Sequence, residues 1–134
     1  MRMSCHLSAG LFGLALLVAV PVAGAQSAGE KYNQILQQTE EDYYNCAKGL
    51  RGKARSQAYI EHGKRAAALW EGWIREYGTD RMVFNARLNL AQALDMAKEP
   101  ERARAAVDEA AASAVSHLEI RRAAEVTKMW APTA

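Results

Sequence analysis

Apolar residues recur at intervals of three or four positions along most of this chain, most clearly between residues 66 and 114. This spacing gathers side chains on one face of an α-helix, so the stretch predicts three amphipathic helices. Their apolar faces are formed by Ala66, Leu69, Trp70, Trp73, Ile74 and Tyr77, then by Phe84, Leu88, Ala91 and Leu94, and then by Ala103, Val107, Ala110 and Ala114. No helix buries its face alone, so we expect the three to pack together. At least one of Trp70 and Trp73 should be deeply buried.

Two short breaks separate these helices. Gly78 follows the first helix and is expected to take a positive φ there, with Thr79 or Asp80 capping the next helix. Residues 98–100 form the second break. Pro100 suits the first turn of a helix, because its missing N–H would have no partner there. We therefore expect tight antiparallel turns at both places.

The pattern extends in both directions from this central stretch. A first helix should bury Tyr32, Ile35 or Leu36, Thr39, Tyr43, Cys46 or Ala47, and Leu50, and the glycines at 49 and 52 should end it. A second helix should run from about residue 53 to residue 77, with Gly63 and Gly72 as points where another helix passes closely. No alternating strand pattern occurs. The predicted fold is all-α, with four or five helices.

The C-terminal part allows two interpretations. Ser116 and Glu119 have the spacing of a capping box, which would start a fifth helix at about residue 117. The alanine-rich sequence is almost as compatible with one uninterrupted helix over residues 101–130. Residues 131–134 should fray.

Small and large residues alternate in a specific order across the central helices. A large–small–large set is followed by a small–large–small set, namely Leu90, Ala91 and Leu94, then Ala103, Val107 and Ala110. In this order the chain resembles the tetratricopeptide-repeat family, whose unit is a helix–turn–helix of about 34 residues. Residues 70–80 resemble the end of a preceding, degenerate repeat. Three positions depart from the family pattern: Arg87, Lys98 and Val115.

The resemblance implies a short array of antiparallel helical hairpins with a concave groove lined by the first helix of each hairpin. Members of the family hold peptides or partner proteins in that groove. In this chain the implied partner-binding residues are Asn85, Asn89 and Gln92, whose amides could hydrogen-bond an extended peptide backbone. The alternative is that these three side chains are simply solvent-exposed. Because such repeats usually stack in threes, self-association or a partner could complete the core.

The first 25 residues have the order of a secretory signal peptide. Arg2 precedes an apolar run over residues 7–20, which is followed by Pro21 and by Ala23-Gly24-Ala25. The run is too short to span about 30 Å of hydrocarbon. We therefore expect cleavage after Ala25, a single helical domain over residues 26–134, no stable membrane insertion, and a bacterial periplasmic or secreted location.

Cleavage would leave a nearly neutral chain with one cysteine. Losing Arg2 lowers the formal net charge from +2 to +1, which gives no reason to expect nucleic acid as a partner. Cys5 would be removed with the signal, so Cys46 would have no intrachain partner. We expect Cys46 to be a buried thiol, with an intermolecular disulfide or a reactive thiol as alternatives.

Opposite net charges fall on consecutive predicted helices. Residues 26–50 carry two basic and four acidic side chains, and residues 51–81 carry seven basic and four acidic ones. This pattern indicates attraction between the two segments rather than a binding site. Within it, the acidic run over residues 40–42 is expected to be a solvated face, because its members point in different directions on a helix.

No motif in the chain predicts catalysis or a bound cofactor. The ligand spacings of structural metal sites are missing for Cys46, His62 and His117, and haem ligation by His117 with Met96 or Met129 lacks an attachment motif. No nucleophile elbow or phosphate-binding loop is present. We therefore expect a non-catalytic interaction protein without cofactor, whose partner is another envelope protein or peptide. The alternative function is a helical bundle that binds a small molecule, haem or metal.

Overall fold

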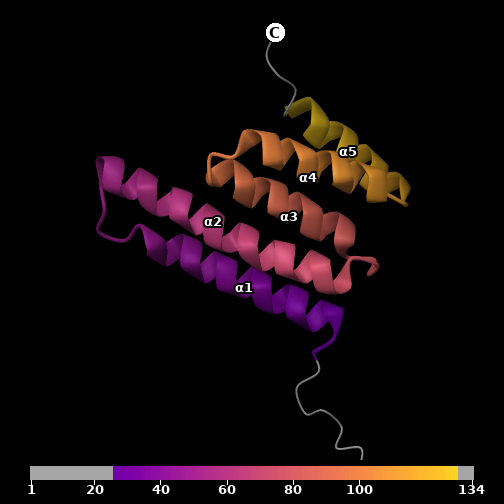
Figure 1. The fold of residues 1–134 in the computed structure, drawn as a ribbon, viewed down its shortest axis with the longest axis horizontal. Helices are drawn as coiled ribbons and strands as arrows, with labels where there is room; N and C mark the ends of the chain where they lie inside the picture. Colours follow the sequence, from indigo (N-terminus) through magenta and orange to yellow (C-terminus); the bar gives the residue numbers. More distant parts are fainter. Residues whose placement is uncertain (1–25, 130–134) are drawn as a thin grey trace, which may run out of the picture.

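The part of the chain that the structure describes folds into five helices and contains no strand (Figure 1). The computed structural model describes residues 26–129, with every side chain in that range except that of His117. The helices are α1 (Ala28–Cys46), α2 (Gly52–Tyr77), α3 (Val83–Met96), α4 (Pro100–Ser113) and α5 (His117–Met129). The predicted all-α fold is confirmed.

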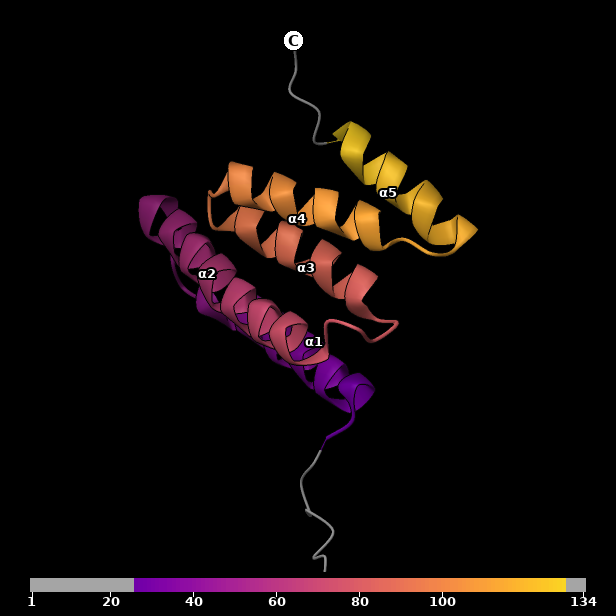
Figure 2. The same ribbon diagram turned by 45° about the vertical axis from the view of Figure 1, so that its right-hand side comes forward.

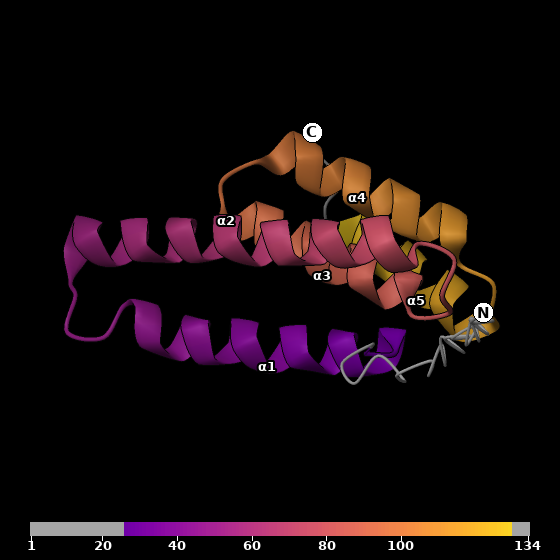
Figure 3. The same cartoon turned by 60° about the horizontal axis from the view of Figure 1, so that its bottom comes forward.

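Consecutive helices pack as antiparallel hairpins and form a short array. The main contacts join α1 to α2, α2 to α3, α3 to α4, and α4 to α5, and the helices follow one another in this order across the array (Figures 1 and 2). The long α1–α2 hairpin extends beyond the turn between α3 and α4, and Figure 3 shows α1 and α2 running side by side along their length. One end of this hairpin therefore has no neighbour among the described helices.

The main core lies where α1, α2, α3 and α4 meet. Trp70 and Trp73 are each only 2% exposed and pack on the ring of Tyr32, with centroid separations of 5.0 and 5.7 Å. The indole N–H of Trp73 also donates to the carbonyl of Ala28, at 3.0 Å. The expected burial of this tryptophan pair is confirmed, and it joins the first helix to the second.

Small residues allow α3 to approach its neighbours. Ala91 and Ala103 are buried in the same cluster as the large residues Leu94 and Val107, so helix backbones come close while their larger side chains interlock. The apolar faces predicted for α3 and α4 are the buried ones. Ala114 is the exception and is only half-buried.

Of the two glycines expected at close approaches, only Gly63 lies at one. A β-carbon at Gly63 would lie 2.5 Å from the Ala97 nitrogen and 2.7 Å from the Ala93 carbonyl oxygen, so the end of α3 crosses α2 at this glycine. The expectation for Gly72 is wrong, since no atom of the described residues outside its own helix backbone lies within 4 Å of the corresponding position. Periodicity shows which residues share a face, but not where along that face another helix crosses.

The helix ends lie near the predicted positions, but their backbone geometry is not always the predicted one. Gly49 and Gly52 take positive φ values of 73° and 57°, which ends α1 and starts α2. Gly78 does not: its φ is −61°, so that prediction is wrong. The chain turns instead through residues 79–82, where the Asp80 carboxylate accepts from the Met82 amide at 2.8 Å. A carboxylate that caps the turn removes the need for a left-handed residue at position 78.

The capping box at residues 116–119 decides between the two C-terminal alternatives in favour of two helices. The Ser116 hydroxyl accepts from the Glu119 amide at 3.1 Å, and the Glu119 carboxylate accepts from the Ser116 amide at 3.0 Å. A small second cluster then holds α5 in place: Phe84 and Leu88 of α3, Ala110 of α4 and Ala123 of α5.

Some expectations fall outside the described residues. These are the signal peptide at residues 1–25, fraying at residues 131–134 and any ligand role of the His117 side chain. Within the described range, none of the helices has the length and hydropathy to cross a membrane.

Candidate functional site: the groove between α1 and α3

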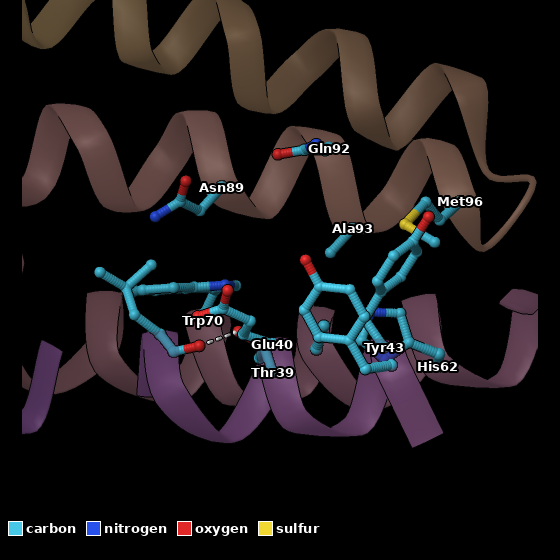
Figure 4. Close-up of a pocket in the computed structure, with 12 residues that line it drawn as sticks. Thr39, Glu40, Tyr43, His62, Trp70, Asn89, Gln92, Ala93 and Met96 are labelled. Carbon is cyan, nitrogen blue, oxygen red and sulfur yellow. Dashed lines mark hydrogen bonds between the residues drawn. The ribbon is translucent and has the colours of Figure 1, made fainter. Parts of the chain in front are cut away.

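A cleft of about 330 Å³ separates the open faces of α1 and α3, with α2 as its floor. Figure 4 places Asn89 and Gln92 of α3 across this cleft from Glu40 and Tyr43 of α1. The lining comprises Leu36, Thr39, Glu40, Tyr43 and Tyr44 from α1, His62, Ala66 and Trp70 from α2, and Asn89, Gln92, Ala93 and Met96 from α3. The site is therefore a surface groove built by three consecutive helices.

The three predicted partner-binding residues lie on one side of α3 but have different surroundings. Gln92 is exposed in the groove. Asn89 also lines the groove, and its amide donates to the Tyr32 hydroxyl at 2.9 Å. Asn85 lies outside the groove lining, and its carbonyl accepts from Arg122 of α5 at 3.2 Å. Hence only Gln92 is fully available, Asn89 is partly engaged, and Asn85 connects α3 to α5.

The wall supplied by α1 carries exposed apolar side chains. Leu36, Tyr43 and Tyr44 are 40%, 42% and 66% exposed. Tyr43 was predicted to lie on the buried face of this helix, and that prediction is wrong. Of the alternatives Ile35 and Leu36, Ile35 is the buried residue. Burial on α1 is confined to Tyr32 and Ile35, because α3 and α4 stop short of the far end of the hairpin and leave the rest of the apolar face uncovered.

Asp42, His62 and Arg65 form a polar cluster beside the groove that sequence reasoning missed. The His62 Nδ1 atom lies 2.7 Å from a carboxylate oxygen of Asp42, and the Arg65 guanidinium donates two hydrogen bonds to the same carboxylate, each at 3.1 Å. Because an ionised carboxylate only accepts, the hydrogen of this pair lies on Nδ1. Asp42 is thus half-buried between two helices, which corrects its expected place on a solvated face.

Opposing effects set the pKa of Asp42. Partial burial raises it, but the hydrogen bonds and positive charges of His62 and Arg65 outweigh burial and hold the pKa of Asp42 below its usual value. The carboxylate therefore stays ionised, and it links α1 to α2 in the sense expected from the opposite charges of the two segments. The opposite net charges of residues 26–50 and 51–81 were the only sequence signal for this cluster.

Cys46 is less buried than expected. It is half-exposed at the end of α1, and its thiol lies 3.5 Å from the Tyr43 carbonyl. The helix turns away into the 47–51 loop here, and Ala47 takes the buried position instead. Among the side chains that the structure describes, no three His, Cys, Asp or Glu residues are grouped so that they could hold a metal ion.

A second cleft of about 240 Å³ lies on the other side of Asn89 and Gln92, toward α5. Leu88, Arg122, Val126 and Met129 are among its lining residues. The exposed amide of Gln92 therefore forms the rim between two hollows, one toward α1 and one toward α5.

No family model, curated protein or solved structure matches this chain. The function must therefore be argued from the geometry of the groove and from the chemistry of its side chains.

Proposed function

We propose that this protein is an exported, non-catalytic interaction module that resembles tetratricopeptide repeats and holds an extended peptide segment of an envelope protein in the groove between α1 and α3. The observation that carries the proposal is the groove itself, where exposed apolar residues of α1 face amide groups of α3. Apolar pockets supply affinity for side chains, and amides such as that of Gln92 pair with peptide carbonyls and N–H groups.

The shape of the groove supports a peptide better than a small molecule. It is an open channel between two helices, and its exposed residues Leu36, Tyr43 and Tyr44 extend along more than two turns of α1. A drug-sized ligand is usually held in a cavity that buries most of its surface. An extended segment, in contrast, needs contacts distributed along a line.

A random-heptapeptide phage library tests this proposal. Selection on the immobilised wild-type protein should enrich peptides, and replacing exposed Gln92 with Trp should abolish the enrichment by filling the groove. Gln57→Trp is the matched control, because Gln57 lies nine residues before Ala66 and therefore on the opposite side of α2. Equal enrichment on both variants, or none on the wild type, would contradict the proposal.

Export is tested separately by intact-mass analysis of the envelope fraction. Cleavage after Ala25 predicts a soluble species that begins at Gln26. A species that retains Met1 in the membrane pellet would contradict export without affecting the proposed groove.

A further inference from the structure

Three tyrosines gather at the open end of the groove. The ring of Tyr43 lies 5.6 Å from that of Tyr44 in an edge-on arrangement and 5.3 Å from that of Tyr59 on α2. Tyr43 and Tyr44 are the two exposed aromatic residues of the groove wall. A substantial aromatic surface therefore faces solvent at one place in the groove.

Glu40 lines the same groove as Tyr43 and Tyr44. It precedes Tyr43 and Tyr44 by three and four residues, so the three side chains are neighbours on the surface of α1. Among the described groove residues Glu40 supplies the carboxylate, and there is no lysine or arginine in the lining.

The other two acidic residues of the run over residues 40–42 already have partners. Asp42 pairs with His62 and Arg65, and Glu41 accepts from Gln37 at 3.0 Å. No hydrogen bond or ion pair to Glu40 occurs among the described residues. Its negative charge is therefore left uncompensated on the groove wall.

We propose that the peptide bound in this groove places a lysine or arginine side chain against Glu40, Tyr43 and Tyr44. This inference rests on the proposed peptide-binding function and adds the chemistry of the partner. A cation is attracted both by the carboxylate and by the faces of tyrosine rings. The same cluster already holds one cation of the chain, since the Arg55 guanidinium lies 5.5 Å from the centre of the Tyr59 ring.

The charge of the groove lining also disfavours acidic and neutral peptides. An acidic peptide would bring its carboxylate toward Glu40 with no lining lysine or arginine to balance it, and a neutral peptide would leave Glu40 unpaired against an apolar segment. The groove should therefore prefer a basic residue over a neutral one, and a neutral one over an acidic one.

The test uses three phage-displayed heptapeptide libraries that are identical except for a central residue fixed as Lys, Leu or Glu. Each library is selected on the wild-type protein, on Glu40→Lys and on the control Glu41→Lys. The control makes the same change in net charge at an exposed neighbour that lies outside the groove lining. Circular dichroism confirms that all three proteins are folded.

On the wild type and on Glu41→Lys, the Lys library should be enriched about tenfold over the Glu library, which is the combined effect of a cation–π contact and a surface ion pair. On Glu40→Lys the order should reverse. Equal enrichment of the three libraries on the wild type, or the same order on Glu40→Lys, would overturn the cation preference while leaving peptide binding in place. Failure of all three libraries would overturn both this inference and the proposed function.

Discussion

Gly63 is the residue at which two helix backbones meet, and it allows a sharp comparison with Gly72 on the same helix. Gly63→Ala would drive a methyl group into the backbone of residues 93–97. The substitution should destabilise the protein by about 1–3 kcal/mol, the usual cost of overpacking a rigid contact. Gly72→Ala meets open space and should instead stabilise the helix by about 0.5–1 kcal/mol.

Urea unfolding of the two variants, followed by circular dichroism, measures both effects. The two substitutions make the same chemical change on the same helix, so their helix-propensity gains are equal and the difference isolates the crossing at Gly63. If Gly63→Ala were as stable as Gly72→Ala, α3 would not cross α2 at this point.

Asp42 makes stability depend on pH in a defined direction. Burial alone would raise the pKa of Asp42, but the pKa is lowered in the folded protein because the hydrogen bonds from His62 and Arg65 outweigh the effect of burial. A carboxyl group with a depressed folded pKa contributes stability above its unfolded pKa and loses that contribution as pH falls through the folded value. The contribution of Asp42 should therefore be complete at pH 7 and be lost progressively as pH falls below about 5, through the lowered folded pKa.

Asp42→Asn should accordingly cost about 1 kcal/mol at pH 7 and less at pH 2.5. Unfolding free energies measured at both pH values give the comparison. Glu41→Gln is the control, since Glu41 is exposed and accepts only from Gln37, and its effect should be small at either pH. A cost for Asp42→Asn that does not change with pH would show that the charge of Asp42 is unimportant.

At the scale of elements, the end of α3 has the geometry of a glycine-terminated helix without the glycine. Lys98 takes a φ of 61°, its amide donates to the Asp95 carbonyl at 3.0 Å, and the Glu99 amide donates to the Leu94 carbonyl at 2.9 Å. This paired hydrogen-bond pattern favours glycine at the left-handed position. Lys98→Gly should therefore raise stability by about 0.5–1 kcal/mol.

Glu99→Gly provides the control for that substitution, because Glu99 has a φ of −115°, which any residue adopts. It should destabilise the protein through added freedom of the unfolded chain. Thermal melts of the two variants should shift in opposite directions. A lower melting temperature for Lys98→Gly would mean that the lysine side chain contributes more than its backbone conformation costs.

The contact between α3 and its neighbours depends on alanine. Ala91 and Ala103 are almost completely buried, so replacing either with leucine should cost about 1–3 kcal/mol through overpacking. Ala105→Leu on α4 is the control, since this alanine is exposed. Thermal unfolding that is equally unaffected by all three changes would contradict close packing at these two alanines.

At the scale of the whole molecule, the array should not be equally stable along its length. The main core is formed by α1, α2, α3 and α4. Among its described side chains, α5 contributes one buried residue, Ala123, to the smaller cluster, and half-buried Val126 packs against both clusters. Local opening requires little free energy where few apolar contacts are lost. Amide hydrogens of α5 should therefore exchange faster than those of α3 and α4, as hydrogen-exchange mass spectrometry can measure. Equal protection would indicate that all five helices unfold as one unit.

Much of the fold could be predicted from local pattern. The central helices, the buried tryptophan pair, the glycines that end α1, Pro100 at the start of α4 and the capping box before α5 all depend on residues a few positions apart. The candidate site was only partly predictable. Asn89 and Gln92 were placed on the groove side of α3, but the exposed tyrosines and the Asp42 cluster were not foreseen.

The sequence by itself determined most helix boundaries and which helix faces are apolar, because these properties arise from hydrogen bonds and spacing within one turn. It left open whether residues 101–130 form one helix or two. Only the tertiary structure decided that α3 crosses α2 at Gly63 and not at Gly72. It also decided that the far half of α1 stays open and that Asp42 meets His62 and Arg65, twenty or more residues away. Helix length relative to a neighbour, and the point of crossing, determine which part of an apolar face becomes core and which part becomes groove.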